Sequence, residues 1–176
     1  LRTAVDRFFA TQAAEDATAY LGLWSQTTNR PDPGQLKYIF DSGDDRFLDL
    51  EIAKATVDDD AARVRGSITR VRSTVSAANP GGAPRMFTTR MPFALAFVRE
   101  DGEWKLLREG SPVDELANAL ITAPDPSTRA AMLAAEQDLV TQRLIDALGR
   151  QADPLARAGE FTGAQAIYER AVEVAV

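Results

Sequence analysis

The stretch MPFALAFVREDGEWKLL, residues 91–107, decides the fold. Every second residue in its first half is large and apolar, which is typical of a strand with one buried face: Met91, Phe93, Leu95 and Phe97. The pair Asp101-Gly102 is typical of a two-residue hairpin turn, and residues 103–107 continue as a second strand. The stretch therefore predicts an antiparallel hairpin.

Two more strands precede this hairpin. From Phe47 onward Leu48, Leu50 and Ile52 fall on alternate positions, and after the Asp-rich turn at residues 58–60 a second alternating run begins at Ala62. In that run the apolar parity shifts to Val71 and Val75, which predicts a β-bulge and a bend. The composition of AANPGGAP, residues 77–84, predicts the loop that leads to the hairpin.

The chain before these strands predicts three helices. Val5, Phe8 and Phe9 have helical spacing, and Asp16 can cap a second helix that carries Tyr20 and Trp24. Proline and glycine at residues 31–34 end that helix, and a third follows at residues 35–40. Helices followed by hairpins predict an α+β fold, in which N-terminal helices cover one face of a curved antiparallel sheet. We expect Phe8, Trp24, Phe93 and Phe97 to be buried between the two layers.

The C-terminal part predicts helices alone. Ser111-Pro112 and Asp125-Pro126 each combine a capping residue with a first-turn proline, and Thr141 can begin a further helix. We therefore expect two parts: an α+β domain at residues 1–111 and an all-helical extension at residues 112–176.

Composition excludes several classes of function. The formal net charge is −6, which disfavours binding to nucleic acid, and no apolar run approaches the roughly 20 residues that span a bilayer. The chain contains no His and no Cys, so any chemistry would depend on carboxylates, Tyr, Ser, Thr, Lys or Arg. We expect a soluble chain without a cofactor. It begins with Leu1, which leaves a cytoplasmic protein and one exported after removal of a signal equally open.

Two segments carry a resemblance to a known family. AVDRFFATQAAEDATAYLGLWS, residues 4–25, and FVREDGEWKLLREGS, residues 97–111, lie in the order typical of the nuclear-transport-factor-2-like fold. This fold, also called SnoaL-like or cystatin-like, is a cone formed by helices on a curved sheet. The resemblance implies a pocket between the helices and the concave face, but the fold serves enzymes, ligand-binding modules and inert interaction domains alike.

Polar and aromatic residues that could line such a pocket are the candidate ligand-binding residues: Tyr20, Trp24, Tyr38, Asp41, Asp49 and Arg90. An isomerase of this fold needs a carboxylate base and a Tyr or protonated carboxyl donor, whereas a dehydratase relies on His, which is absent. For Tyr38 and Asp41, an ordinary place on a helix surface is the favoured interpretation. Core packing is the favoured interpretation for Trp24. No residue is assigned a catalytic role.

The acidic clusters at residues 41–45 and 57–60 lack the spacing of a calcium loop. We interpret them as a helix exit and a solvated turn, and we assign no metal. The arginines of the paired strands, such as Arg63 and Arg65, can balance acidic residues across the sheet or bind an anion, and pairing is favoured. A convex face with charges of both signs favours a monomer or a weak dimer.

The segment AGEFTGAQAIYERAVEVA, residues 158–175, resembles the second half of a tetratricopeptide repeat. The resemblance implies a helix pair near residues 141–176, with Ala164, Tyr168 and Ala171 as candidate partner-interface residues. Pro154 would kink or divide the first helix. Such a pair buries its faces only against neighbours. The tail therefore either folds back on the cone, or it packs against further repeats or a protein partner and meanwhile pairs with another copy of the chain, and the second is favoured.

Two functional hypotheses follow. A cone followed by a helical linker and a first repeat resembles the front of larger bacterial proteins that continue into more repeats. The favoured hypothesis is therefore a non-catalytic protein-interaction or small-ligand-binding module of a larger bacterial protein. The alternative is an isomerase or hydrolase-type enzyme that uses carboxylates in the cone. A buried carboxylate beside a Tyr would favour the enzyme, whereas a cone filled by apolar side chains would favour the module.

Overall fold

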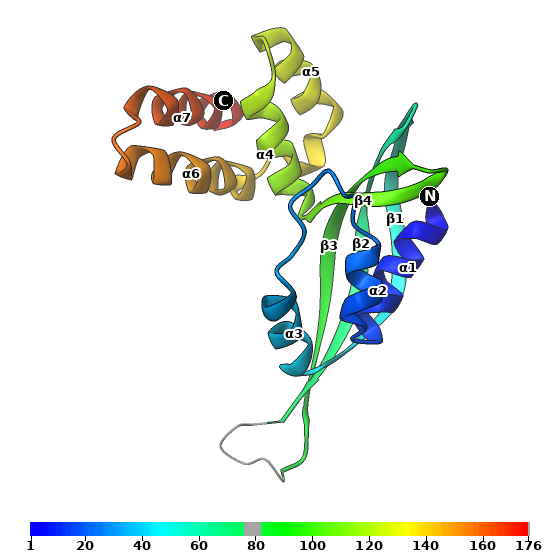
Figure 1. Ribbon diagram of the computed structural model, residues 1–176. Helices are drawn as coiled ribbons and strands as arrows, with labels where there is room; N and C mark the ends of the chain where they lie inside the picture. Colours follow the sequence, from blue (N-terminus) through cyan, green and yellow to red (C-terminus); the bar gives the residue numbers. More distant parts are fainter. Residues whose placement is uncertain (76–81, 176) are drawn as a thin grey trace. The chain divides into compact units, whose positions relative to one another are not determined.

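The computed structural model describes residues 1–75 and 82–175. Most of the predicted loop at residues 77–84 lies outside this range. Contacts divide the chain into two compact units, Leu1–Glu109 and Gly110–Val176. Helices followed by an antiparallel sheet and then by helices confirm the predicted α+β class (Figure 1).

The first unit begins with three helices: α1 (Arg2–Ala13), α2 (Ala17–Gly22) and α3 (Pro33–Asp41). Asp16 caps α2 as expected, because its Oδ1 accepts a hydrogen bond from the Ala19 amide at 2.9 Å. The third helix starts two residues before the predicted one. Asp32 caps it by accepting from the Gln35 amide at 2.9 Å, and Pro33 fits its first turn, where no amide hydrogen is needed.

The sheet has the order β1-β2-β3-β4 in the described residues. Its strands are β1 (Asp44–Asp58), β2 (Ala61–Thr74), β3 (Arg85–Glu100) and β4 (Glu103–Gly110). The predicted hairpin joins β3 to β4, and Asp101 and Gly102 both have positive φ, 51° and 81°. A tight turn of this hand suits the natural twist of the two strands.

The predicted bulge in β2 is wrong. The register of β2 with β3 runs without a shift from Ala61 opposite Val98 to Thr74 opposite Arg85. The extra residues lie in β1, between Leu48 and Glu51 and between Ile52 and Lys54. β2 keeps its alternation throughout, so the apolar parity changes through residue type alone: Arg70 and Arg72, which lie near Asp45, occupy the positions that continue the face of Val64 and Ile68. Val75 follows the strand and is half exposed.

The core of the first unit lies between its helices and one face of the sheet (Figure 1). α1 contributes Val5, Phe8 and Phe9. The sheet contributes alternate residues of β2 and β3 together with Leu106 of β4. Phe8, Trp24, Phe93 and Phe97 are all buried, as the apolar spacing predicted. Trp24 also forms a bridge with Leu106, through which the end of α2 is fastened to β4.

The second unit contains α4 (Pro112–Thr122), α5 (Pro126–Ala135), a short 3-10 helix (Gln137–Leu139), α6 (Gln142–Arg157) and α7 (Phe161–Ala175). Its own core contains Leu116 and Leu120 of α4, Leu144 and Leu148 of α6, and Ile167 of α7. Pro154 does not divide α6, because it falls in the last turn, where little of the helix remains to be disrupted.

Gly159 ends α6 and reverses the chain into α7. Its φ is 83°, and the Glu160 amide donates to the Leu155 carbonyl at 2.8 Å while the Gly159 amide donates to Ala156 at 3.1 Å. These two bonds form a Schellman motif, which satisfies the last carbonyls of the helix. α6 and α7 therefore lie side by side as an antiparallel pair (Figure 1). None of the helices in the described residues is long and apolar enough to span a membrane.

Candidate functional site

Aromatic side chains fill the interior of the cone. Phe9 contacts Phe47 and Phe93 with ring centroids 5.2 and 5.1 Å apart. Tyr20 contacts Phe8 at 5.7 Å and Phe40 at 6.1 Å. An enclosed space of about 20 Å³ remains beside Phe8, Phe97 and Trp104. That volume holds about one water molecule, so this space is too small for an organic substrate.

Tyr20 and Glu109 form a polar pair in the first unit. Tyr20 is 2% exposed, and its hydroxyl donates to Oε2 of Glu109 at 2.8 Å. Burial raises the pKa of the Tyr20 hydroxyl far above its usual value, and the charge of Glu109 adds to the rise. Burial also raises the pKa of the Glu109 carboxyl, although the hydrogen bond from Tyr20 acts against this. Glu109 lies at the end of β4 and is exposed to solvent when the whole residue is considered.

Trp24 lies next to this pair. Its ring centroid is 6.2 Å from that of Tyr20, and the side chain is 6% exposed. The indole N–H is close enough to lower the pKa of Tyr20 slightly, yet its buried nitrogen meets no partner with hydrogen-bond geometry among the described residues. The structure thus brings two of the predicted pocket residues together, and it adds Glu109, which the sequence did not indicate.

Tyr38 and Asp41 lie away from this pair on α3. The Tyr38 side chain is 77% exposed and borders a shallow surface depression with Ile39. Asp41 accepts from Nζ of Lys37 at 2.8 Å, an ordinary pair one helical turn apart on an exposed face. Among the hydrogen bonds and ring contacts of the described residues, none joins Tyr38 or Asp41 to the Tyr20–Glu109 pair.

Asp49 and Arg90 meet each other on the sheet. Asp49 is the bulged residue of β1, with φ 52°, and its carbonyl accepts from Nη1 of Arg90 at 2.8 Å. Arg90 also donates to Oε2 of Glu51 at 2.8 Å and pairs with Thr69 across β2. Arg90 of β3 thus contacts both β2 and β1 at the bulge. These contacts account for its position without a ligand.

The candidate interface residues lie on α7. Ala164 is 2% exposed and packs in the core of the second unit, and Ala171 is half buried beside it. Tyr168 is 42% exposed, and its hydroxyl donates to Oδ1 of Asp153 on α6 at 2.6 Å. Together with Phe161 and Val172, which are 70% and 62% exposed, Tyr168 borders a shallow, open groove that is lined by α7 and by Ala156 of α6. The sequence did not mark Phe161 or Val172 as exposed.

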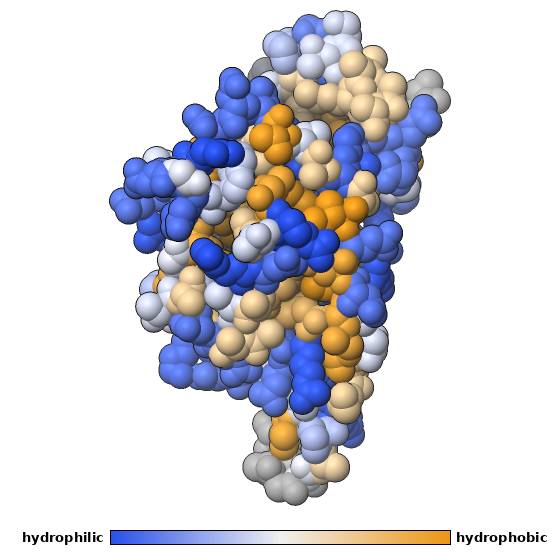
Figure 2. All heavy atoms as spheres, turned by 90° about the vertical axis from the view of Figure 1, so that its right-hand side faces the viewer, coloured by the Kyte–Doolittle hydropathy of each residue, from blue (hydrophilic) through white to orange (hydrophobic). Residues whose placement is uncertain are grey.

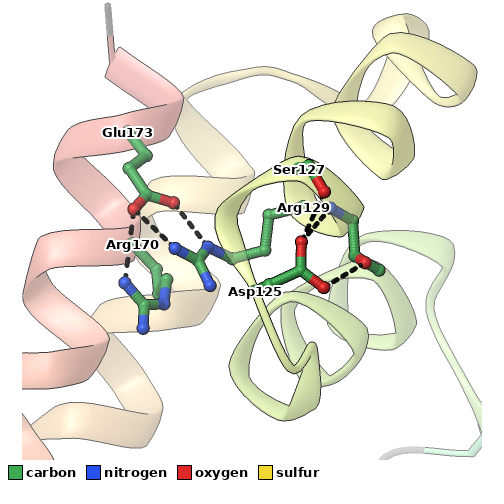
Figure 3. Close-up of polar contacts among 6 residues, drawn as sticks. Asp125, Ser127, Arg129, Arg170 and Glu173 are labelled. Atoms are coloured by element: carbon green, nitrogen blue, oxygen red, sulfur yellow. Dashed lines mark hydrogen bonds and ion pairs between the residues drawn. The ribbon is translucent and has the colours of Figure 1, made fainter.

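Arg129 holds α5 against α7 (Figure 3). Its side chain is 5% exposed, and it donates to both carboxylate oxygens of Glu173, at 2.8 and 3.0 Å. Arg170 approaches the same carboxylate at 3.2 Å. The two hydrogen-bonded cations hold the pKa of Glu173 below its usual value. One turn earlier in α5, Asp125 accepts from Ser127 and Thr128 and caps the helix (Figure 3).

The side of the molecule on which α1 and β1 lie carries a band of hydrophobic side chains among polar ones (Figure 2). β1 is an edge strand of the sheet, and its Leu48 and Val57 are 51% and 57% exposed. The two bulges interrupt the regular edge of β1, which discourages pairing with another strand. Across residues 1–75 and 82–175, no group of three or more acidic side chains is placed to hold a metal ion.

Solved structures resemble the chain in its fold. A candidate dehydratase of the nuclear-transport-factor-2-like family from Streptomyces avermitilis is 14% identical, with 61% of this chain and 89% of that protein covered and a TM-score of 0.50. The chain has the nuclear-transport-factor-2-like fold over about 61% of its length. The predicted cone is therefore confirmed.

Two further structures are similar over the same share of this chain. A conserved protein from Planctomyces limnophilus is 15% identical, with 61% of this chain and 88% of that protein covered and a TM-score of 0.47. A ketosteroid isomerase-like protein from Erwinia carotovora atroseptica is 11% identical, with 61% and 88% covered and the same TM-score of 0.47. No protein-family model and no curated protein matches the chain. At such identities the likeness concerns the fold alone, and the tetratricopeptide resemblance of the last helices stays a prediction.

Proposed function

We propose that this chain is a non-catalytic protein-interaction module. The observation that carries the proposal is the filled interior of the cone, where the enclosed space beside Phe97 and Trp104 is about 20 Å³. A drug-sized ligand needs roughly 300 Å³ or more, so the space beside Phe97 and Trp104 offers no room for one. The groove bordered by Phe161, Tyr168 and Val172 instead exposes apolar side chains at the surface, which is typical of a binding site for another protein.

Site-specific photo-crosslinking tests the proposal. A photoreactive amino acid replaces Gln165, which lines the groove, and in a matched variant it replaces Arg143, which is exposed at the start of α6. Each variant is expressed and irradiated in the cells in which the protein naturally occurs, so that its natural partners are present. We expect a discrete adduct of higher mass from position 165 and none from position 143. Equal adducts from both positions, or none from position 165, would contradict the proposed function.

The Tyr20–Glu109 pair supports the alternative, an enzyme that uses a carboxylate. A carboxyl group with a raised pKa beside a buried Tyr is an arrangement that can transfer a proton or donate a hydrogen bond to a substrate oxygen. Such an enzyme requires the aromatic side chains of the interior to move apart for the substrate. The filled interior therefore makes this the second candidate.

Proton exchange distinguishes the enzyme from the module. Simple ketones are incubated with the protein in deuterated buffer, and deuterium incorporation next to the carbonyl is followed by NMR. An enzyme of this type would exchange these protons, and Glu109→Gln would abolish the exchange. We expect no exchange above the buffer rate with either protein.

A further inference from the structure

Three exposed side chains form one face of α7. Phe161, Tyr168 and Val172 are seven and four residues apart, and with Gln165 between them they follow the helical repeat of one face. The groove that they border, here called the α7 groove, has a volume of about 450 Å³ and a floor that includes Ala156 and Ala164. Small residues in the floor allow the backbone of another helix to come close, while the larger side chains flank it.

Carboxylates dominate the charged residues around the α7 groove. Glu169 lines it, Glu160 immediately precedes Phe161, and Asp153 accepts the Tyr168 hydroxyl. Arg157 is a positively charged residue near the groove. Its Nη2 lies 3.9 Å from Oδ2 of Asp153, and this exposed pair is weak. The three carboxylates carry more negative charge than Arg157 can balance, so the surroundings of the groove are negative. The chain as a whole has a formal net charge of −6, which favours a basic partner in the same way.

We propose that the α7 groove binds an amphipathic helix of another protein, with apolar residues that follow the spacing of Phe161, Gln165, Tyr168 and Val172 and with Lys or Arg on both sides of that stripe. This inference rests on the proposed function and names the class of partner. The apolar residues would pack on the floor of the groove, and the basic residues would pair with Glu160 and Glu169. Binding should therefore weaken as salt screens these charges.

A second copy of the chain fits the groove less well. Its α7 groove carries the same carboxylates, so two grooves in contact would repel each other. The apolar faces of α4 and α6 are already buried in the core of the second unit, and that of α1 is buried in the cone. α3 exposes Tyr38 and Ile39, but its Lys37 pairs with Asp41 on the same helix, which leaves this face without a net positive charge from that lysine.

Fluorescence anisotropy with a designed peptide tests the proposal on the full chain. The labelled peptide has about the length of α7, with Leu at positions i, i+4, i+7 and i+11 and Lys beside this stripe. A matched peptide has Glu in place of each Lys. We expect the Lys peptide to bind at least about tenfold more tightly than the Glu peptide, and this difference should shrink at high salt.

Variants locate the binding. Val172→Glu, which places a charge in the groove, should lower the affinity for the Lys peptide by about tenfold or more, and Phe161→Ser provides a second change in case the first disturbs folding. The double variant Glu160→Gln with Glu169→Gln should bind the Lys peptide more weakly, and its affinity should depend less on salt concentration. Val57→Glu, at an exposed apolar residue of β1, is the matched control and should leave binding unchanged.

The outcomes separate this inference from the proposed function. Equal binding of both peptides, or no loss with Val172→Glu and Phe161→Ser, would overturn it. No binding of the Lys peptide together with a crosslinked adduct at position 165 would overturn the basic helix and leave the interaction module standing. A dimer in sedimentation velocity that Val172→Glu dissociates would identify a second copy as the occupant and overturn it as well.

Discussion

The side chain of Trp24 anchors the end of α2 in the cone. It is 6% exposed, and the chain on either side of it bonds to β4: the Leu106 amide donates to the Leu23 carbonyl at 2.7 Å, and the Ser25 amide donates to the Leu106 carbonyl at 2.8 Å. Trp24→Ala should therefore lower the free energy of unfolding by about 3–5 kcal/mol through lost burial and a cavity. Urea denaturation measures this change.

Tyr38→Ala is the control for Trp24→Ala, because Tyr38 is 77% exposed. Its effect should stay within about 0.5 kcal/mol. A Trp24→Ala protein as stable as the control would contradict the position of Trp24 between helices and sheet.

Tyr20 gives the protein a specific response to alkaline pH. Its pKa is raised in the folded state by burial, so the neutral form is favoured there, and the unfolded chain ionises first as pH rises above about 10. The stability that Tyr20 contributes is present below this pH and is lost above it. Tyr20→Phe should therefore show a smaller loss of stability between pH 9 and 11 than the wild type.

Urea denaturation across this pH range checks the prediction for Tyr20. The wild type and the variant share all other titrating groups, so the difference between their two curves isolates Tyr20. Parallel curves would show that the Tyr20 hydroxyl ionises as readily in the folded protein as in the unfolded chain.

The pairing of β1 with β2 depends on a close approach at Gly66. A Cβ at this position would lie 2.0 Å from the Glu51 carbonyl oxygen and 2.9 Å from Cζ of Phe93. Because the first contact is with backbone, a side chain here must displace the strand. Gly66→Ala should cost about 3 kcal/mol or more, at the upper end for overpacked cores, as measured by urea denaturation.

Gly149→Ala provides the opposite case on α6. A Cβ there meets nothing within 4 Å, so alanine should raise the stability of the second unit by about 0.5–1 kcal/mol through its better helix propensity. The same effect from both glycine substitutions would contradict the close approach of β1 and β2 at Gly66.

The Arg129–Glu173 pair decides how firmly α5 is held on α7 (Figure 3). The pKa of Glu173 is lowered in the folded state, so its contribution is present above the usual carboxyl pKa and is lost as pH falls through the folded value. Glu173→Gln should lower the thermal midpoint of the second unit at pH 7. It should also reduce the further loss of stability on acidification.

Glu169→Gln is the matched control on the same helix. Glu169 is exposed and accepts a hydrogen bond from Gln165 one turn away, at 3.0 Å. Its substitution should leave the thermal midpoint nearly unchanged at both pH values, because exposed polar contacts contribute little. Circular dichroism at 222 nm follows the melting of both variants.

At the scale of the whole molecule, the two units have separate hydrophobic cores. Residues of the helices and the sheet form the first, and residues of α4, α6 and α7 form the second. A fragment of residues 1–111 should therefore fold and keep most of the urea stability of its unit. Near-UV circular dichroism of Trp24 and Trp104, both inside this fragment, reports its packing. A fragment without a cooperative transition would show that the cone needs the helical unit to fold.

The sequence by itself determined the local features of this protein. Alternating apolar residues identified β3, the Asp101-Gly102 pair identified the turn to β4, and capping residues such as Asp16 and Ser111 marked helix starts. The helical period also placed Phe8 and Trp24 in the core. These features depend on residues within one or two turns of each other, so a pattern in the chain is enough to find them.

The tertiary structure alone decided the candidate site. Tyr20 and Glu109 are 89 residues apart, and they meet because the end of β4 lies beside α2. The bulges fell in β1, where Asp49 meets Arg90, although the parity change lay in β2. The spacing of α7 showed which residues share a face, but the packing of α6 decided that Ala164 is covered while Phe161 and Val172 remain exposed. Strand register and helix packing join distant segments, and no local pattern carries that information.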